Sequence, residues 1–162
     1  MNASIRPATE VDVPILLMFI RELAEYEKLT HEVSATEQQL HTTLFGPRRF
    51  AEALLAYADG EPVGFVLFFH NYSTFLARPG MYLEDLFVRP AYRGRGLGKL
   101  LLTTVARIAV ERGCGRYEWT VLDWNTPSIR FYESLGAEMK GDWRIMRVTG
   151  AALEGMAKLA SK

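Results

Sequence analysis

The sequence predicts one domain of the α/β or α+β class, built around a single central sheet. Segments with the two-residue repeat of a strand alternate along the chain with segments whose apolar residues recur every three to four positions, as in helices. The chain has 162 residues, of which 49% are hydrophobic, enough for one substantial core. It shows no internal repeat, low-complexity tract or Pro/Gly/Ser-rich linker, so we expect residues 1–162 to form a single domain.

The first part of the chain predicts a strand and two helices. A short strand over residues 4–8 is followed by Thr9, which we expect to cap a helix together with Asp12. Apolar residues then recur at every fourth position and carry this helix into the segment AEYEKL: Ile15, Phe19 and Leu23. Thr36 begins a second, shorter helix.

The middle of the chain predicts three strands, over residues 53–58, 63–73 and 80–88, with a turn at the DGEP segment between the first two. A glycine-rich stretch follows. After it, an apolar stripe predicts a helix: Leu97, Leu101, Val105 and Ile108.

The last part of the chain predicts a strand, a helix and a final strand. The strands cover residues 116–122 and 142–148. The helix between them covers residues 125–136, with Pro127 at an early helical position and Gly136 after its end.

Bulk composition excludes several classes of function. The chain has 19 basic and 19 acidic residues, so no net charge draws it to nucleic acid or to an anionic membrane. No apolar run approaches the ~20 residues of a membrane-spanning helix, and the N-terminus lacks a signal-peptide pattern. With Cys114 as the single cysteine, no disulfide forms within the chain, and we expect a cytoplasmic protein. The three histidines lack metal-ligand spacing, so we expect no metal site.

The glycine-rich stretch RPAYRGRGLGKLL, residues 89–101, lies between a strand and a helix, an arrangement that commonly binds phosphate. Two nucleotide-binding patterns fail here. The P-loop needs Ser or Thr where Leu100 stands, and Lys99 replaces the third glycine of the dinucleotide fingerprint.

A third pattern fits. The segment Arg93-x-x-Gly96-x-Gly98 resembles the R/Q-x-x-G-x-G/A signature of the GCN5-related N-acetyltransferases (GNAT). The segments IRPAT, YLEDLFV and WNTPSIRFYESLGA occur in the order found in that superfamily, and with RELAEYEKL they look like its diamine acetyltransferase branch, which holds the spermidine/spermine and thialysine enzymes. The resemblance implies the GNAT fold: a central, mixed, mostly antiparallel and twisted sheet with a splayed strand pair, flanked by helices.

The resemblance also implies acetyl-CoA as the acetyl donor. Its pyrophosphate would lie on main-chain N–H groups of the glycine-rich stretch, where the glycines allow close approach. The backbone of the preceding strand would pair with the pantetheine amides, and one N–H near Val88 would hold the thioester oxygen. For Asn125 and Ser128 the alternative role is a helix cap. The residues expected to bind this cosubstrate are Leu86, Val88, Arg93, Gly94, Arg95, Gly96, Leu97, Gly98, Lys99, Asn125 and Ser128.

Two residues are expected to carry the chemistry. Tyr132 aligns with the tyrosine that serves as general acid in much of the superfamily; its alternative is a packed aromatic side chain. Glu84 is the candidate base, acting through water, and its alternative is an exposed strand position. Asp85 follows directly and would point to the opposite face unless a bulge re-aims one of the two.

Cationic acceptors favour acidic and aromatic surroundings. The residues expected to bind the acceptor are Glu27, Tyr26, Asp85, Trp124 and Arg78. For Glu27 the alternative is a solvated helix face. Spermidine-type enzymes carry an acid and a tryptophan where this chain has Ser73 and Phe75, and Arg78 would suit an acceptor with a carboxylate. We therefore expect a lysine-, ornithine- or thialysine-like amino acid as acceptor, with polyamines second.

Three alternatives stay open at this point. The chain would be a GNAT acting on a protein, peptide or antibiotic amine, a non-catalytic regulatory module that binds coenzyme A, or a nucleic-acid-binding protein that uses the basic cluster. The neutral net charge argues against the last. The resemblance further implies a homodimer.

Overall fold

In the computed structural model of this protein, residues 2–160 are described. They form two compact units, one reaching to Thr120 and the other beginning at Val121. The expected single domain over residues 1–162 therefore stays a prediction.

The first unit is built around a five-stranded sheet in the order β1-β2-β3-β4-β5. Strands β1 to β4 pair antiparallel with their neighbours, and β5 runs parallel to β4. This mixed, mostly antiparallel sheet confirms the predicted fold class. The strands are β1 Ala3–Pro7, β2 Glu52–Ala58, β3 Glu61–Ser73, β4 Arg78–Val88 and β5 Tyr117–Trp119.

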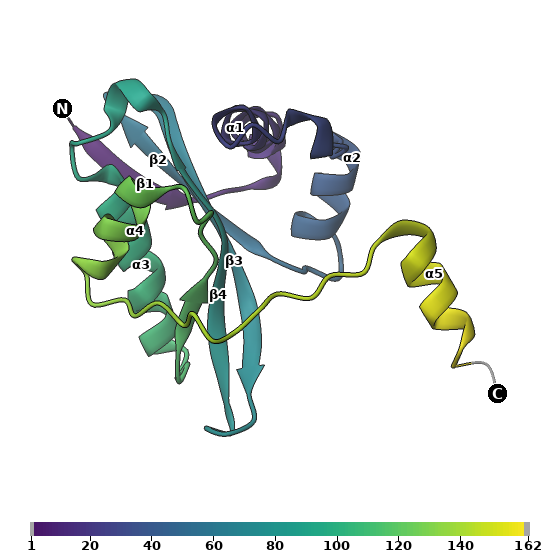
Figure 1. The fold of residues 1–162 in the computed structure, drawn as a ribbon. Coiled ribbons are helices and arrows are strands. Elements are labelled where there is room, and N and C mark those ends of the chain that lie inside the picture. Colours follow the sequence, from purple (N-terminus) through teal and green to yellow (C-terminus); the bar gives the residue numbers. More distant parts are fainter. Residues whose placement is uncertain (1, 161–162) are drawn as a thin grey trace. The chain divides into compact units, whose positions relative to one another are not determined.

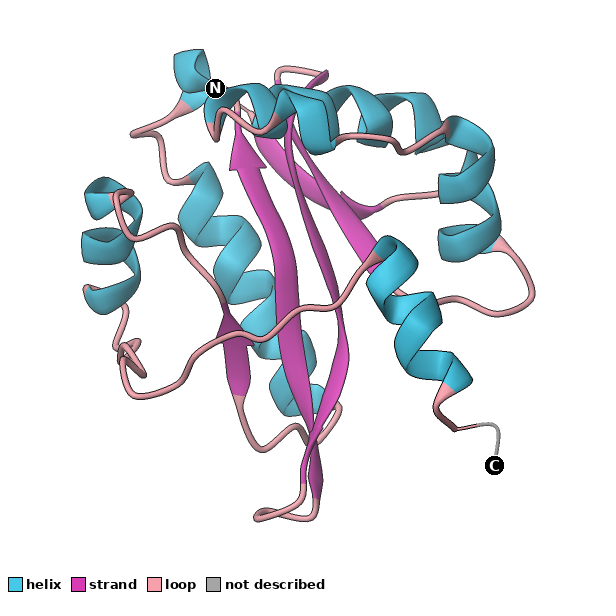
Figure 2. Ribbon diagram, turned by 45° about the vertical axis from the view of Figure 1, so that its right-hand side comes forward, coloured by secondary structure: helices cyan, strands magenta, loops and turns pink. Residues whose placement is uncertain are grey.

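The parallel pair of strands diverges along its length. Only the first part of β4, Met81–Leu83, is in register with β5, whereas β4 itself continues to Val88. Figure 2 shows β3 and β4 as the two long strands, joined by the turn at one end of the sheet. The short register with β5 confirms the splayed pair, and it leaves one edge of the last part of β4 outside the β5 ladder.

Helices lie on both faces of this sheet (Figure 1). On one face α1, Val13–Tyr26, buries Phe19 against Phe65 and Phe87, with ring centroids 5.8 and 6.1 Å apart. On the other face α3, Leu97–Glu111, buries its stripe of Leu97, Leu101, Leu102 and Val105. The short helix α2, Glu37–Leu40, continues into a π-helical turn, His41–Phe45. Three 3-10 turns complete the unit: Glu10–Asp12, Thr30–Glu32 and Pro90–Tyr92.

The predicted cap before α1 is present. The backbone N–H and the hydroxyl of Thr9 both donate to Asp12 Oδ2 at 2.8 Å. Arg6 donates to both carboxylate oxygens of Asp12, and this bond holds the pKa of the carboxyl well below its usual range. The start of α1 is thus fixed to β1.

The second unit contains two helices, α4 Thr126–Glu133 and α5 Gly150–Lys158. The predicted strand over residues 142–148 is wrong, because these residues adopt no strand. Their apolar members are exposed, Trp143 by 78% and Met146 by 91%. A strand forms only where a second backbone supplies its hydrogen bonds, so apolar alternation alone did not produce one. None of the helices within residues 2–160 has the length and apolarity needed to cross a membrane.

Candidate active site

The glycine-rich stretch forms a tight loop between β4 and α3. Gly94 has φ +73° and Gly96, which is the N-cap residue of α3, has φ +84°. An added Cβ would meet no atom within 4 Å at either position, so the backbone conformation, and not a lack of space, requires glycine here. At Gly98 an added Cβ would lie 4.0 Å from Val88 Cγ2, and this helical residue has no such requirement.

The loop presents main-chain donors to the start of a long helix. The N–H groups of Leu97, Gly98 and Lys99 belong to the first turn of α3, where no intrahelical acceptor exists; the first helical bond runs from Leu100 N to Gly96 O, at 2.9 Å. The positive end of the helix dipole lies at the same place. We refer to residues 93–99 as the donor loop, because this geometry fits the diphosphate of coenzyme A.

The end of β4 supplies a backbone edge beside the donor loop that lies outside the β5 register. Arg89 N donates to Val63 O at 2.9 Å, which makes Val88 and Gly64 a non-hydrogen-bonded pair of the β3–β4 ladder. The peptide groups of Val88 and, two residues earlier, of Leu86 therefore point away from β3. They face the side where β5 has already left the register, as the expected pairing with pantetheine requires.

The two arginines of the donor loop contact the protein itself. Arg93 Nε donates to Val88 O at 2.8 Å, and its guanidinium carbon lies 4.3 Å from the ring centroid of Tyr26. The guanidinium carbon of Arg95 lies 5.4 Å from the ring centroid of Tyr92. Main-chain N–H groups, rather than Arg93, are thus the donors that the fold leaves pointing outward from the loop.

A β-bulge lies where the sequence places two adjacent acids. Leu83 pairs with Phe68 and Asp85 pairs with Leu67, so Glu84 is an extra residue in β4. The strand is therefore not unbroken here, and the bulge re-aims one of the two acids. Glu84 is exposed, whereas Asp85 is half-buried on the α1 face of the sheet, because it shares that face with Leu67 and Phe87.

A third carboxylate approaches the bulge from α1. Glu27 is the C-cap residue of this helix and is half-buried, so its alternative as a fully solvated side chain does not hold. Burial raises the pKa of Glu27. Burial, and after it the negative charges of Glu84 and Glu27, raise the pKa of Asp85 to about 7. We call Glu27, Glu84 and Asp85 the acid cluster.

The remaining residues expected at the acceptor side do not all join the cluster. Tyr26 adjoins Glu27 at the end of α1, but the contact with Arg93 occupies a face of its ring. Arg78 begins β4, six residues before Glu84, which places it about 20 Å away along the strand. The first unit therefore does not bring Arg78 to the acid cluster.

Trp124, Asn125, Ser128 and Tyr132 belong to the second unit. Asn125 is buried and caps α4, accepting a bond from Ser128 N at 3.4 Å, so its expected alternative role is present. Tyr132 is half-buried near the end of α4, and its ring centroid lies 5.3 Å from that of Phe131. Trp124 is 50% exposed.

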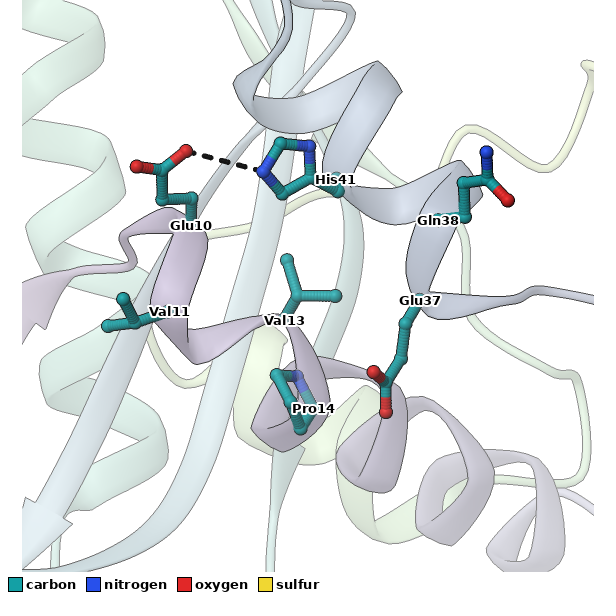
Figure 3. Close-up of a pocket in the computed structure, with 7 residues that line it drawn as sticks. All are labelled: Glu10, Val11, Val13, Pro14, Glu37, Gln38 and His41. Carbon is teal, nitrogen blue, oxygen red and sulfur yellow. Dashed lines mark ion pairs between the residues drawn. The ribbon is translucent and has the colours of Figure 1, made fainter.

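A surface pocket lies elsewhere, at the starts of α1 and α2. Figure 3 shows its lining, in which Glu10 and His41 form an ion pair at 3.3 Å. None of the expected site residues contributes to it. Within the described residues 2–160, no group of three or more His, Cys, Asp or Glu side chains is arranged to hold a metal ion.

The comparison with protein-family models identifies the family to which this chain belongs. The model of the acetyltransferase (GNAT) family matches residues 18–137, which include the later part of α1, the acid cluster, the donor loop and α4. The chain belongs to the GNAT acetyltransferase family. GNAT enzymes use acetyl-CoA as cosubstrate, and the chain is accordingly an N-acetyltransferase.

Individual GNAT proteins resemble it over nearly their whole length. The L-ornithine N5-acetyltransferase NATA1 of Arabidopsis thaliana is 38% identical, with 98% of this chain and 90% of that protein aligned. The thialysine N-epsilon-acetyltransferase of Sus scrofa is 41% identical, with 94% and 96% aligned. Among solved structures, an integron cassette protein from the mobile metagenome of V. cholerae superposes with a TM-score of 0.81 at 26% identity, covering 98% of this chain and 99% of that one.

Proposed function

We propose that this GNAT enzyme transfers the acetyl group of acetyl-CoA to the side-chain primary amine of a lysine-, ornithine- or thialysine-like amino acid. The acid cluster carries the proposal, because three carboxylates close to the edge of β4 outside the β5 register suit a cationic acceptor next to the donor. Relatives named for ornithine and thialysine acetylation support the same acceptor class. Polyamines are the second candidate.

The acceptor nitrogen must first lose a proton. An alkyl ammonium has a pKa of about 10.4, so almost none is deprotonated at pH 7. Glu84, exposed at the bulge, accepts this proton through a water molecule. Asp85 is a second candidate base, because a pKa of about 7 suits proton transfer near neutral pH.

The freed amine attacks the thioester carbon directly. A new C–N bond forms while negative charge develops on the thioester oxygen, and a backbone N–H around Val88, aimed away from β3, stabilises that charge. The C–S bond then breaks. Tyr132 donates a proton to the departing thiolate, and the new amide nitrogen returns its surplus proton to the tyrosinate. The products are the acetylated amine and coenzyme A, and the proton first taken from the ammonium passes to water.

A thiol-release assay with acetyl-CoA tests the proposal. The panel contains L-ornithine, L-lysine, thialysine and spermidine, and we expect the three amino acids to give the higher kcat/KM. A clear preference for spermidine would replace the amino-acid acceptor by a polyamine. No turnover with any amine, despite coenzyme A binding, would favour an acceptor amine on a protein, peptide or antibiotic, or a non-catalytic coenzyme A-binding module.

A substitution at Tyr132 tests its role as the general acid. Tyr132→Phe is expected to lower kcat by about 100-fold, the range typical of a lost general acid, with the Kd for coenzyme A unchanged. Tyr72→Phe is the matched control, since Tyr72 is 59% exposed at the end of β3. Unchanged kcat in Tyr132→Phe would remove this residue from the acid role.

We also propose that the enzyme is cytoplasmic, as expected from the sequence, and acts as a homodimer, as the family resemblance implies. Exposed apolar side chains in the second unit support the dimer, since extended apolar surface marks interaction sites. Trp143, Ile145 and Met146 are 78%, 67% and 91% exposed in a segment with strand-like alternation. Light scattering should give twice the chain mass, and a monomer at micromolar concentration would contradict the dimer.

A further inference from the structure

Arg93 joins three elements of the first unit. It begins the donor loop, it donates from Nε to the carbonyl of Val88 at the end of β4, and its guanidinium stacks over Tyr26, the last residue of α1. The guanidinium carbon is 4.3 Å from the ring centroid of Tyr26 and 5.7 Å from that of Phe87. A cation within about 6 Å of an aromatic face is attracted to it, so this contact ties the loop to the helix.

A second arginine, Arg89, lies between β4 and the donor loop and contacts the same helix. Arg89 donates to both carboxylate oxygens of Glu22, at 2.7 and 2.9 Å, and its guanidinium carbon lies 5.1 Å from the ring centroid of Phe19. Phe19, Glu22 and Tyr26 are three and four residues apart and therefore share one face of α1. The segment from Arg89 to Arg93, which leads into the donor loop, is thus held against α1 at two positions along the helix.

The Arg93 contact lies next to the acid cluster. Tyr26 is followed directly by Glu27, whose charge helps to raise the pKa of Asp85. Tyr26, whose ring holds the Arg93 guanidinium, is therefore the immediate chain neighbour of Glu27, a carboxylate of the acceptor side. Arg89 makes its contacts one to two turns further from Glu27.

We propose that Arg93 is a positioning residue that couples the two halves of the site, so that coenzyme A and the acceptor amine strengthen each other's binding. The proposal rests on the function proposed above. A ligand on the donor loop fixes Gly94 and Gly96, and with them Arg93. Arg93 in turn fixes Tyr26 and the Glu27 end of α1, which lowers the conformational entropy that amine binding must still remove. By linkage, the amine strengthens coenzyme A binding by the same factor.

Calorimetry with unacetylated coenzyme A, which cannot turn over, measures this coupling. Its Kd is determined with and without saturating L-ornithine. In the wild type, ornithine is expected to lower the Kd about 5-fold, the lower end of typical couplings. Tyr26→Leu removes the aromatic face and should bring this factor to about one, whereas Tyr26→Phe keeps the face and should keep the factor.

Two further variants separate coupling from stability. Arg89→Gln breaks the bond to Glu22, lowers stability and should leave the coupling factor near its wild-type value. Arg93→Gln keeps a donor for the Val88 carbonyl but loses the stacking, so the factor should fall to about one. In the Arg93→Gln background, Tyr26→Leu should change nothing more, as expected for two residues that act through one contact.

The outcomes are distinct. Normal coenzyme A binding with a coupling factor of one in the wild type would overturn the coupling role alone. Equal losses from Tyr26→Leu with and without Arg93 would also overturn it, because the two residues would then act separately. A wild-type protein that binds no coenzyme A would overturn the proposed function, and this inference with it.

Discussion

The donor loop follows β4 and the acid cluster joins β4 to the end of α1, yet the two are built differently. The donor loop uses the backbone: two glycines with positive φ and the N–H groups at the start of α3, all within seven consecutive residues. The acid cluster uses side chains from α1 and β4, which a bulge and the packing of α1 bring together. A site made of backbone is visible in residue spacing, whereas a site made of side chains depends on tertiary structure.

The largest expected effect in this comparison is at Gly96. Gly96→Ala forces a Cβ into φ +84°, a strain of roughly 1–2 kcal/mol, and should weaken coenzyme A binding about 10-fold in calorimetry. Gly98→Ala is the matched control. The backbone at residue 98 does not have positive φ, and the added Cβ finds room. The Kd of this variant for coenzyme A should therefore stay within about 2-fold of the wild-type value. Equal Kd values for the two variants would show that the backbone conformation at Gly96 does not build the site.

The next effect is the pH dependence of acceptor binding, through Asp85. Its carboxyl has a pKa of about 7 and attracts a cationic amine only after losing its proton. The KM for the amine should therefore fall by several-fold from pH 6 to pH 8 in the wild type and change little in Asp85→Asn. If the variant kept the wild-type profile, the acceptor side would not depend on this carboxylate.

The same residue affects folding, and the sign follows from its raised pKa. Between about pH 4 and pH 7 the folded state keeps a proton on Asp85 that the unfolded state has released, so stability falls as the pH rises through this window. Asp85→Asn removes that loss. In urea unfolding it should be more stable than the wild type at pH 8 by roughly 1–2 kcal/mol, after allowance for partial exposure, with the difference shrinking toward pH 4.

The sequence predicted the parts of the molecule that local pattern controls. These are the strands up to Trp119, the cap at Thr9 and the need for glycine at positions 94 and 96 of the donor loop, though not at position 98. The adjacent acids left two arrangements open, an unbroken strand with opposite faces or a bulge, and the structure contains the bulge.

What the sequence could not predict depends on partners distant in the chain. The pKa of Asp85 needs Glu27 and burial, and the stacking of Arg93 needs Tyr26, so neither follows from spacing. The segment 142–148 has the apolar alternation of a strand but adopts none, since pairing also requires a second backbone. Arg78 was expected near the acceptor because of the resemblance to the thialysine-type enzymes, yet β4 places it about 20 Å from the bulge.

The smallest effect tests whether backbone conformation matters on the acceptor side too. Lys28, directly after Glu27, has φ +61°. Leu29 N donates to Ala24 O at 2.8 Å, a bond typical of helix ends at which glycine usually occupies the position of Lys28. Lys28→Gly relieves the strain and adds backbone freedom to the unfolded chain, so we expect a net gain of only about 0.5 kcal/mol in urea unfolding. Ala77→Gly, at φ +49° in the β3–β4 turn, should give a gain of similar size. If side chains alone build the acid cluster, Lys28→Gly leaves the KM for the amine unchanged. A change of more than about 3-fold would mean that the backbone of the turn at the end of α1 orients Glu27, just as the glycine backbone shapes the donor loop.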